Sequence, residues 1–403
     1  MSALWLIAFV WLVILTITIH GLSRQGSLSP TTNFRLTASD APLVSILVPA
    51  RNEQYRVLEA CIRSILAQDY GRFEVIAVND RSTDATGATL ETLAGSDRRL
   101  RVIEGKEPPP GWLGKPYAMQ QALNHARGEW ILATDADVIF EPSALHTALD
   151  RILEANASAL TLLPRFEAHS FWERVMIPTW AWVFLMFTFF YRIDDPNTER
   201  AAGIGGFFLI RRTVLDRVGG YEMLKDEVLE DVRLAERIKG SGARLFSEQA
   251  PALIRTRMYK TFAEMWECST KNWFSGVNFS FPAALFCVAS MYVFAVLPPL
   301  IALVSATAIT LGVNTELSWF LVPAMLSWLL QVLVMAVVST RSEVSILYAL
   351  TSPLGLAIMY AMLFDSSIKI TIGRGVTWKG RKIYARDGVR PPGSDFCELD
   401  DNK

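Results

Sequence analysis

The stretch that decides the fold is Trp130-Ile-Leu-Ala-Thr-Asp-Ala-Asp137, an apolar run that ends in two carboxylates. The run is typical of a buried strand, where an ionised acid without a partner is energetically unfavourable. The pair Asp135 and Asp137 at its carboxyl end therefore indicates a hard cation with oxygen ligands, Mg²⁺ or Mn²⁺. Because substrate phosphates commonly complete the shell of such ions, the pattern favours a nucleotide or nucleotide-sugar site. The alternative is a polar turn in which Asp caps a helix.

Segments around this run alternate between strand and helix patterns. The predicted strands are 44–48, 73–78, 101–103 and 130–134, and the predicted helices are 58–66, 83–93, 117–126 and 143–153. This order predicts an α/β fold with a largely parallel sheet and helices on both of its faces. Ligands bind at the carboxyl ends of the strands in open sheets of this kind.

Two further polar clusters follow predicted strands. Pro49-Ala50-Arg51-Asn52-Glu53 comes after the first strand, and Asn79-Asp80-Arg81-Ser82 comes after the second. Turn chemistry alone is a poor explanation for carboxylates at three separate strand ends. The sequence therefore predicts one binding site at this edge of the sheet.

Hydrophobic residues make up 51% of the 403 residues and gather in a few long segments. These segments are 3–19, 175–191, 282–311, 317–338 and 344–364, and several are long enough to cross a bilayer. The first has no basic lead-in and no evident small-residue cleavage site, which favours a retained anchor over a signal peptide. We therefore expect an integral, multi-pass membrane protein.

The composition also argues against several kinds of partner and binding site. The net charge is -1 and no basic stripe is interleaved with aromatic residues, so nucleic acid is not an expected partner. The four cysteines form no C-x-x-C pair, and the four histidines show no metal spacing. Neither a disulfide framework nor a zinc site is expected.

The expected organisation has five parts. An anchor over residues 1–22 and a linker over 23–40 precede a catalytic domain over 41–278, and transmembrane helices over 279–365 and a basic, then acidic tail over 366–403 follow it. Within the catalytic stretch, the apolar segment 175–191 is interrupted by Pro178 and is expected to lie on the membrane surface, although plain core packing remains the alternative.

Four motifs in order resemble those of family 2 glycosyltransferases of the GT-A fold. They are Val48-Pro-Ala-Arg-Asn-Glu53, Val78-Asn-Asp-Arg-Ser-Thr-Asp84, Gly114-Lys115 and Asp135-Ala-Asp137, and the resemblance covers roughly residues 43–278. It implies that the first two motifs hold the nucleoside of a UDP- or GDP-linked sugar and that the D-x-D holds the metal on the diphosphate. The family's second motif usually begins with two acids, whereas Asn79 replaces the first here, which leaves the nucleotide less certain.

The resemblance implies specific roles. Asp137, together with Asp135, would bind the cation, and the donor would contact the residues Pro49, Ala50, Arg51, Glu53, Asp80, Lys115 and Asp135. Lys115 opens a predicted helix, where its ammonium can meet a phosphate or the sugar, although a solvated lysine is the alternative.

Glu230 and Asp231 match the family's E-D motif at the start of an apolar-periodic helix. Asp231 is the candidate base, because an acceptor hydroxyl is a poor nucleophile until a carboxylate takes its proton. A single displacement of this kind inverts the anomeric configuration. The alternative is that both acids only favour the positive end of a helix, worth about 0.3–1 kcal/mol.

On the acceptor side we expect Gly205, Gly206 and Trp273. The glycines belong to Gly203-Ile-Gly-Gly206 and permit close backbone approach, although a simple bulge is also possible. Trp273 is all that remains of the Q-x-x-R-W motif of processive synthases, in Ser269-Thr-Lys-Asn-Trp273. This departure argues against polymer synthesis.

The chain as a whole resembles bacterial lipid-acceptor enzymes of the carotenoid (diaponeurosporenoate-type) and hopanoid-associated glycosyltransferases. It shares their amino-terminal anchor, Arg257-Met258-Tyr259 and Trp378-Lys-Gly-Arg381. The expected function is transfer of a single sugar to the hydroxyl or carboxyl of a lipid such as a carotenoid, hopanoid or polyprenyl compound. A processive polysaccharide synthase and a non-catalytic binding or transport protein are the alternatives.

The basic residues near the apolar segments give conflicting indications of the membrane topology. Arg24 after the anchor is consistent with a cytosolic catalytic domain in the cytoplasmic membrane. Three later crossings would then put the basic tail, with Lys369 and Arg374, outside. One segment is therefore expected to be re-entrant or interfacial, and Ser352-Pro-Leu-Gly355 is the expected break.

Overall fold

The computed structural model describes residues 2–313, 316–378 and 381–383, except 32–33, 35, 37–40 and 55–56. Part of the predicted linker and most of the predicted tail lie outside the described residues.

A seven-stranded sheet with the order β3-β2-β1-β4-β8-β6-β9 forms the centre of the soluble part. The first four strands in this order pair in parallel, β8 runs antiparallel to both of its neighbours, and β9 is parallel to β6. The largely parallel α/β sheet predicted from the sequence is confirmed. The strands are β1 (Val44–Ala50), β2 (Phe73–Asn79), β3 (Leu100–Glu104), β4 (Trp130–Ala133), β6 (Ala159–Leu163), β8 (Phe208–Arg211) and β9 (Leu245–Gln249).

Three short strands form a second sheet with the order β5-β10-β7. They are β5 (Val138–Phe140), β7 (Arg165–Phe166) and β10 (Ile254–Thr256). β5 follows β4 after a short turn, so Asp135 and Asp137 lie in the connection between the two sheets.

Successive side chains along each strand of the large sheet point to opposite faces, and helices bury both faces. In β1, Ile46 and Val48 belong to one hydrophobic core, and Leu47 belongs to the other. The first core includes α2 (Leu58–Leu66), α3 (Thr86–Ser96) and α5 (Ala144–Glu154). The second includes α4 (Gly114–His125), α7 (Arg212–Arg217) and α8 (Glu230–Gly240), and it continues into the apolar helices.

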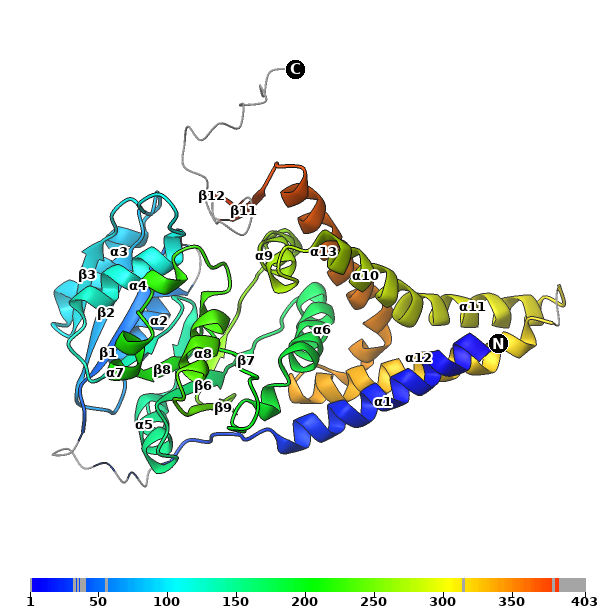
Figure 1. Cartoon of the computed structure of the whole chain (residues 1–403), viewed down its shortest axis with the longest axis horizontal. Coiled ribbons are helices and arrows are strands. Elements are labelled where there is room, and N and C mark those ends of the chain that lie inside the picture. Colours follow the sequence, from blue (N-terminus) through cyan, green and yellow to red (C-terminus); the bar gives the residue numbers. More distant parts are fainter. Residues whose placement is uncertain are drawn as a thin grey trace, which may run out of the picture.

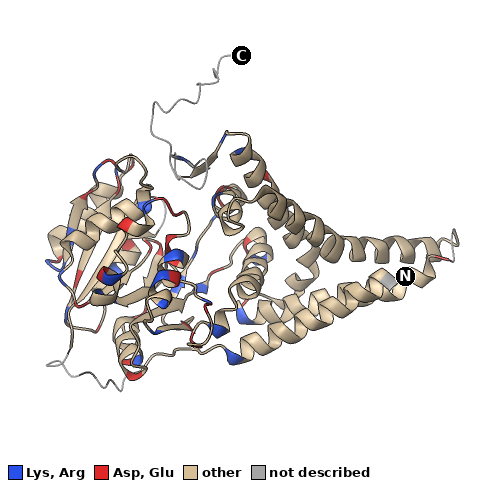
Figure 2. Cartoon of the chain, viewed as in Figure 1, with Lys and Arg blue, Asp and Glu red and all other residues tan. Residues whose placement is uncertain are grey.

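Five helical stretches among the described residues are long and apolar enough to cross a membrane. They are α1 (Ser2–Arg24), α6 (Phe171–Thr188), α10 (Phe281–Met291) continuing into α11 (Leu297–Thr310), α12 (Ser318–Arg341) and α13 (Ser352–Thr371). Figure 1 shows α1, α11 and α12 projecting away from the sheet, whereas α6, α13 and α9 (Phe262–Gly276) lie nearer to it. Charged residues are sparse along the projecting helices (Figure 2).

The projecting helices are joined by polar contacts inside an apolar bundle. The indole Nε1 of Trp11 on α1 donates to the carbonyl of Phe294, 2.8 Å away. Pro298 has no N–H for that carbonyl, so the indole replaces the missing helical donor. The Ser327 hydroxyl on α12 donates to the carbonyl of Leu4, 3.4 Å away. These bonds fix α1 against α12 and against the bend between α10 and α11.

Helix α6 and the last apolar segment differ from the sequence prediction at their starts. α6 begins at Phe171 rather than at 175, because Ser170 and Glu173 form a capping box that starts the helix earlier. The last apolar segment starts as the short 3₁₀ helix η4 (Ile346–Thr351) and changes to the α-helix α13 at Ser352, and the two remain one helical stretch. The break expected at Ser352 is therefore seen only as this change of helix type.

Candidate functional site

Adjacent parallel strands bring the predicted polar clusters to one edge of the sheet. Ala50 pairs with Asn79, and Leu47 pairs with Ala133, so β1, β2 and β4 end close together. The backbone N–H of Asp80 donates to the carbonyl of Ala50 at 2.8 Å, and this hydrogen bond connects the two segments just beyond the end of β2.

The loop after β1 is fixed to the loop after β2. The Arg51 Nη1 donates to the carbonyl of Asp80 at 2.7 Å, and the backbone N–H of Glu53 donates to the hydroxyl of Thr86 at 2.7 Å. Glu53 and Asp80 are both buried. Pro49, Ala50, Arg51, Glu53 and Asp80, all predicted to contact the donor, therefore lie together, and their roles stay predictions.

Asn79 has a structural contact that the sequence did not indicate. Its Nδ2 donates to both carboxylate oxygens of Glu104 on β3, at 3.0 and 2.9 Å, and its Oδ1 accepts from the backbone N–H of Ser82 at 3.3 Å. This amide holds the neighbouring strand and loop, so it is committed within the protein. Sequence reasoning missed Glu104, although its place at the end of a predicted strand was a usable signal.

Three acids surround the buried thiol of Cys61. Burial and the neighbouring charges of Asp137, Glu53 and Asp135 raise the pKa of this thiol. Asp135 and Asp137 lie in the same turn, and their carboxylate oxygens are ligands of the kind that a hard cation prefers. No group of three or more His, Cys, Asp or Glu side chains in the described part of the chain is arranged to hold a metal by itself. The two aspartates of the turn would leave most of the coordination shell of such an ion to substrate phosphates and water.

Lys115 joins the D-x-D turn to the E-D motif. Its Nζ lies 2.7 Å from an Asp135 carboxylate oxygen and 2.6 Å from one of Glu230. Burial opposes the charge of the ammonium, but Asp135 and Glu230 outweigh it and hold the pKa of Lys115 well above its usual value. The solvated lysine that the sequence left open is not observed.

Asp231 adjoins this cluster at the first turn of α8. Its Oδ2 accepts from the backbone N–H of Gly205 at 2.9 Å, and its Oδ1 accepts from the N–H of Val232 at 2.8 Å. Burial and the charge of Glu230 raise the pKa of Asp231 to about 6, while Lys115 acts in the opposite direction. A carboxyl with such a pKa is poised to accept a proton near neutral pH.

The segment Gly203-Ile-Gly-Gly206, which precedes β8, is packed against Asp231 and Asp135. A Cβ on Gly203 would lie 2.2 Å from the carbonyl oxygen of Asp231, and a Cβ on Gly205 would lie 2.8 Å from Asp135 Oδ2 and 3.1 Å from Lys115 Nζ. At Gly206 the nearest side-chain atom would be 3.5 Å away. Close approach is therefore required at two of these glycines, and Gly205, predicted for the acceptor side, lies beside Asp135 and Lys115.

A cavity of about 1040 Å³ extends from Asp231 towards the apolar helices. We call it the chamber; its lining includes Trp180, Phe184, Asp231, Tyr259, Trp273 and Leu363. Trp273, predicted for the acceptor side, lies in it. Sequence reasoning missed Trp180 and Tyr259 as lining residues, although the aromatic richness of the α6 segment was noticeable.

Three buried polar atoms in the chamber lining have no hydrogen-bond partner among the described residues. They are Nε1 of Trp180, Nε1 of Trp273 and Oδ1 of Asn272. Buried polar groups are nearly always hydrogen-bonded, so these atoms call for a ligand or water with polar groups of its own.

Comparison with known proteins identifies the region around these strand ends. Residues 45–219 match the family model for glycosyl transferase family 2. The match includes the first three polar clusters and Lys115 but ends before Glu230 and Asp231, whose assignment rests on the geometry above.

Two curated relatives are 25% identical to the chain. The alignment with the probable glycosyltransferase YdaM of Bacillus subtilis covers 59% of this chain and 57% of the relative. The alignment with the 4,4'-diaponeurosporenoate glycosyltransferase of Staphylococcus aureus covers 58% of this chain and 62% of the relative. The chain thus spans less than two thirds of either relative.

One solved structure is similar over most of the chain. The mannosyltransferase PcManGT from Pyrobaculum calidifontis, in complex with GDP-Man and Mn²⁺, aligns with a TM-score of 0.51 and 18% identity. The alignment covers 91% of this chain and 98% of that one. The two proteins share the fold.

Proposed function

Because residues 45–219 match the family model for glycosyl transferase family 2, we propose that this protein moves a single sugar from a nucleotide-sugar donor to a lipid. The reacting group on the lipid is a hydroxyl or a carboxyl. The observation that carries the proposal is the position of Asp231, which both adjoins the Lys115 cluster and lines the chamber.

The donor binds at the strand ends. Glu53 and Asp80 face the nucleoside, Lys115 faces the phosphates or sugar, and Asp137 with Asp135 holds Mg²⁺ or Mn²⁺. When bound, the cation offsets the negative charge that develops on the departing diphosphate. The GDP-Man and Mn²⁺ in the structure of PcManGT are consistent with this choice of ligands.

Asp231 acts as the base. It takes the proton of a hydroxyl acceptor as the acceptor oxygen bonds to the anomeric carbon, while the bond from that carbon to the diphosphate oxygen breaks. A carboxyl acceptor is already ionised near neutral pH and attacks without a base. The configuration of the sugar inverts in this single displacement. Glu230, which is paired with Lys115, lies beside Asp231 and raises the pKa of its carboxyl, so that Asp231 is ready to accept the proton.

The chamber accommodates the lipid. Its apolar lining suits a hydrocarbon, and the free N–H groups of Trp180 and Trp273 suit an oxygen-bearing polar end. One of the relatives is named for transfer to diaponeurosporenoate, which is consistent with an apolar acceptor. The catalytic domain lies on the cytosolic face of the cytoplasmic membrane. Nucleotide sugars are made in the cytosol.

Donor binding and transfer can be separated by experiment. In membranes containing the full chain, Asp231→Asn is expected to bind a nucleotide sugar as wild type does but to lose sugar transfer by about a hundredfold or more. Asp137→Asn is expected to weaken donor binding in a way that added Mn²⁺ partly reverses. Nucleotide-sugar binding measured with and without metal, alongside transfer, provides the test. Full transfer by Asp231→Asn would remove the assignment of the base.

A further inference from the structure

α6 is long and apolar enough to span a bilayer, but the fold places both of its ends on the same side. The strands that flank it in the large sheet, β6 before it and β8 after it, pair directly with each other. Its first turn is fixed by Glu173, which accepts from Arg257 Nε at 2.7 Å. A helix whose two ends return to one sheet does not cross a membrane.

The segment after α12 also begins at the soluble domain. Glu343 forms an ion pair with Arg165 of β7 at 2.9 Å. Tyr348 on η4 contacts the first turn of α6 through Phe171, with ring centroids 5.9 Å apart, and through the guanidinium of Arg174. This end of the segment therefore lies where α6 starts.

α13 then packs tightly onto α6. A Cβ on Gly355 would lie 2.5 Å from Thr179 Oγ1 and 3.3 Å from the carbonyl oxygen of Val175. Only a glycine allows this approach between the two helices, and it keeps the first turn of α13 beside the amino-terminal half of α6.

The far end of α13 returns to the soluble domain through α9. Trp266 Nε1 donates to Asp365 Oδ2 at 2.8 Å, and the Ser366 hydroxyl donates to the carbonyl of Thr270. Beyond the helix, the ammonium of Lys271 lies 5.2 Å from the ring centroid of Trp378. Both ends of the segment 343–378 thus contact the catalytic side.

We propose that only α1, the continuous pair α10–α11, and α12 cross the bilayer, and that α6, η4 and α13 form an interfacial layer within the leaflet on the catalytic side. The residues that follow α13 then lie on the same side as the catalytic domain. The partner of the layer's outer surface is the lipid leaflet that the three crossings enter.

The exposed side chains of the layer fit such a leaflet. Ile346, Leu347, Leu350 and Leu354 are 43% to 71% exposed, and they continue the apolar surface of the crossing helices. Basic residues lie at helix ends on either side of this segment, since Arg341 ends α12 and Lys369, paired with Asp365, lies in the last turn of α13. Apolar side chains bordered by basic residues are typical of a surface at headgroup depth.

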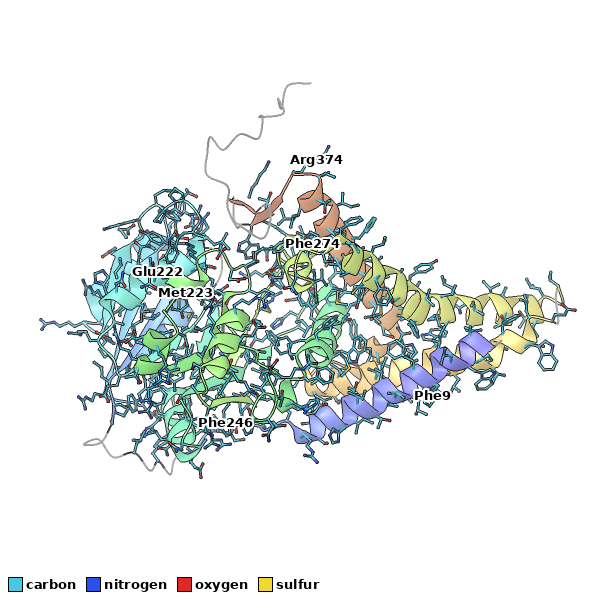
Figure 3. The ribbon with its side chains drawn as sticks, in the orientation of Figure 1. Phe9, Glu222, Met223, Phe246, Phe274 and Arg374 are labelled. Atoms are coloured by element: carbon cyan, nitrogen blue, oxygen red, sulfur yellow. The ribbon has the colours of Figure 1, made fainter. Side chains whose placement is uncertain are left out.

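Charge asymmetry supports the same arrangement. Arg24 is the last residue of α1 and Arg341 is the last residue of α12, and Figure 1 shows these ends of the two helices on the side of the sheet. The sequence 312–317, which connects α11 to α12, has no Lys or Arg. The positive-inside bias therefore places the sheet side in the cytosol. Three crossings with this orientation also keep Arg374 in the cytosol, which removes the topological conflict present in the sequence. Figure 3 shows Arg374 far from the projecting tip of the bundle.

Single cysteines introduced into the full-length chain carrying Cys397→Ser test this arrangement. Val313→Cys reports on the loop between α11 and α12, Arg374→Cys reports on the chain after α13, and Arg101→Cys on β3 is the catalytic-side control. The parent without an added cysteine corrects for any reaction of the three remaining thiols. The readout is labelling by a membrane-impermeant maleimide in intact and permeabilised cells.

We expect Val313→Cys to react in intact cells, and Arg374→Cys and Arg101→Cys to react only after permeabilisation. Ile372→Cys reports on the same place if Arg374→Cys does not accumulate. Reaction of Arg374→Cys in intact cells, with Arg101→Cys protected, would show that α13 crosses and would overturn the proposal. Identical behaviour of all three sites would overturn it as well, because α11 and α12 would then not span the bilayer.

Discussion

Lys115 and Asp231 determine how the activity should depend on pH. The base must be ionised to accept a proton, and burial and Glu230 raise the pKa of Asp231 to about 6. The transfer rate of the wild type is therefore expected to fall as pH drops through about 6. The Lys115 charge lowers this pKa, so Lys115→Met should move the acid limb of the profile to higher pH, whatever its effect on the maximum rate.

Profiles of kcat/KM against pH for the wild type, Lys115→Met and Lys115→Arg make the comparison. The arginine variant keeps the positive charge and should keep the limb near its original position. An acid limb that stays in place in Lys115→Met would show that Asp231 is not the titrating group.

The glycines before β8 separate folding from catalysis at single positions. A Cβ at Gly203 meets the backbone of Asp231, which cannot move freely, so Gly203→Ala should destabilise the fold by about 1–3 kcal/mol. A Cβ at Gly205 meets only the ends of the Asp135 and Lys115 side chains. Gly205→Ala should therefore fold normally but transfer sugar roughly a hundredfold more slowly, because the reacting groups are displaced.

Thermal unfolding in detergent and transfer assays on the same preparations distinguish these outcomes. Gly206→Ala provides the stability control, since its Cβ would meet nothing closer than 3.5 Å. Equal loss of stability in Gly203→Ala and Gly205→Ala would contradict the packing described here.

At the scale of elements, α6 depends on one buried ion pair. Glu173 is 1% exposed and accepts from both Nε and Nη2 of Arg257, at 2.7 and 3.2 Å. Glu173→Gln leaves the guanidinium without its charge partner, and we expect a loss of about 2–3 kcal/mol. The exposed pair of Glu59 and Arg63 on α2 is the matched control, and Glu59→Gln should cost less than about 0.5 kcal/mol.

Denaturant or thermal unfolding of both variants measures this difference. Similarly small losses of stability in Glu173→Gln and Glu59→Gln would show that other contacts hold α6 in place.

Most soluble elements could be predicted from the sequence because their patterns are local. Helix α2 occupies the predicted residues 58–66, and β1, β2 and β4 differ from their predicted bounds by one or two residues. The antiparallel strand β8 was not predicted, because strand direction depends on how distant segments pair. The placement of α13 was equally inaccessible, because its apolar pattern fits a crossing and its tertiary contacts with α6 and α9 decide otherwise.

At the scale of the whole molecule, the chamber depends on segments far apart in the chain. α6, α8, α9, α12 and α13 all contribute to its lining, so no single motif could reveal it. The strand-end residues were predictable as a group, since parallel neighbours bring their carboxyl ends together. The contact between Lys115 and Glu230 was not, because it joins two helices that are distant in sequence.

The volume of the chamber should limit the acceptor and leave the donor unaffected. Ala181 on α6 lines it, and Ala181→Trp places an indole in space that the lipid would occupy. Transfer to lipid should fall by about tenfold or more, with nucleotide-sugar binding unchanged, and Ala181→Val should lie between this variant and wild type. Donor affinity and lipid transfer are measured in parallel. A fall in donor affinity alone would show that the chamber binds the donor and not the lipid.

The central claim is that a lipid receives one sugar in a step that needs Asp231. The most direct measurement is mass spectrometry of lipids extracted from cells that express the wild type or Asp231→Asn, in search of apolar lipids that differ by one hexose. We expect such a lipid with the wild type and none with Asp231→Asn. If no hexosylated lipid forms while membranes consume nucleotide sugar in an Asp231-dependent way, the acceptor is a growing polymer and the account is contradicted.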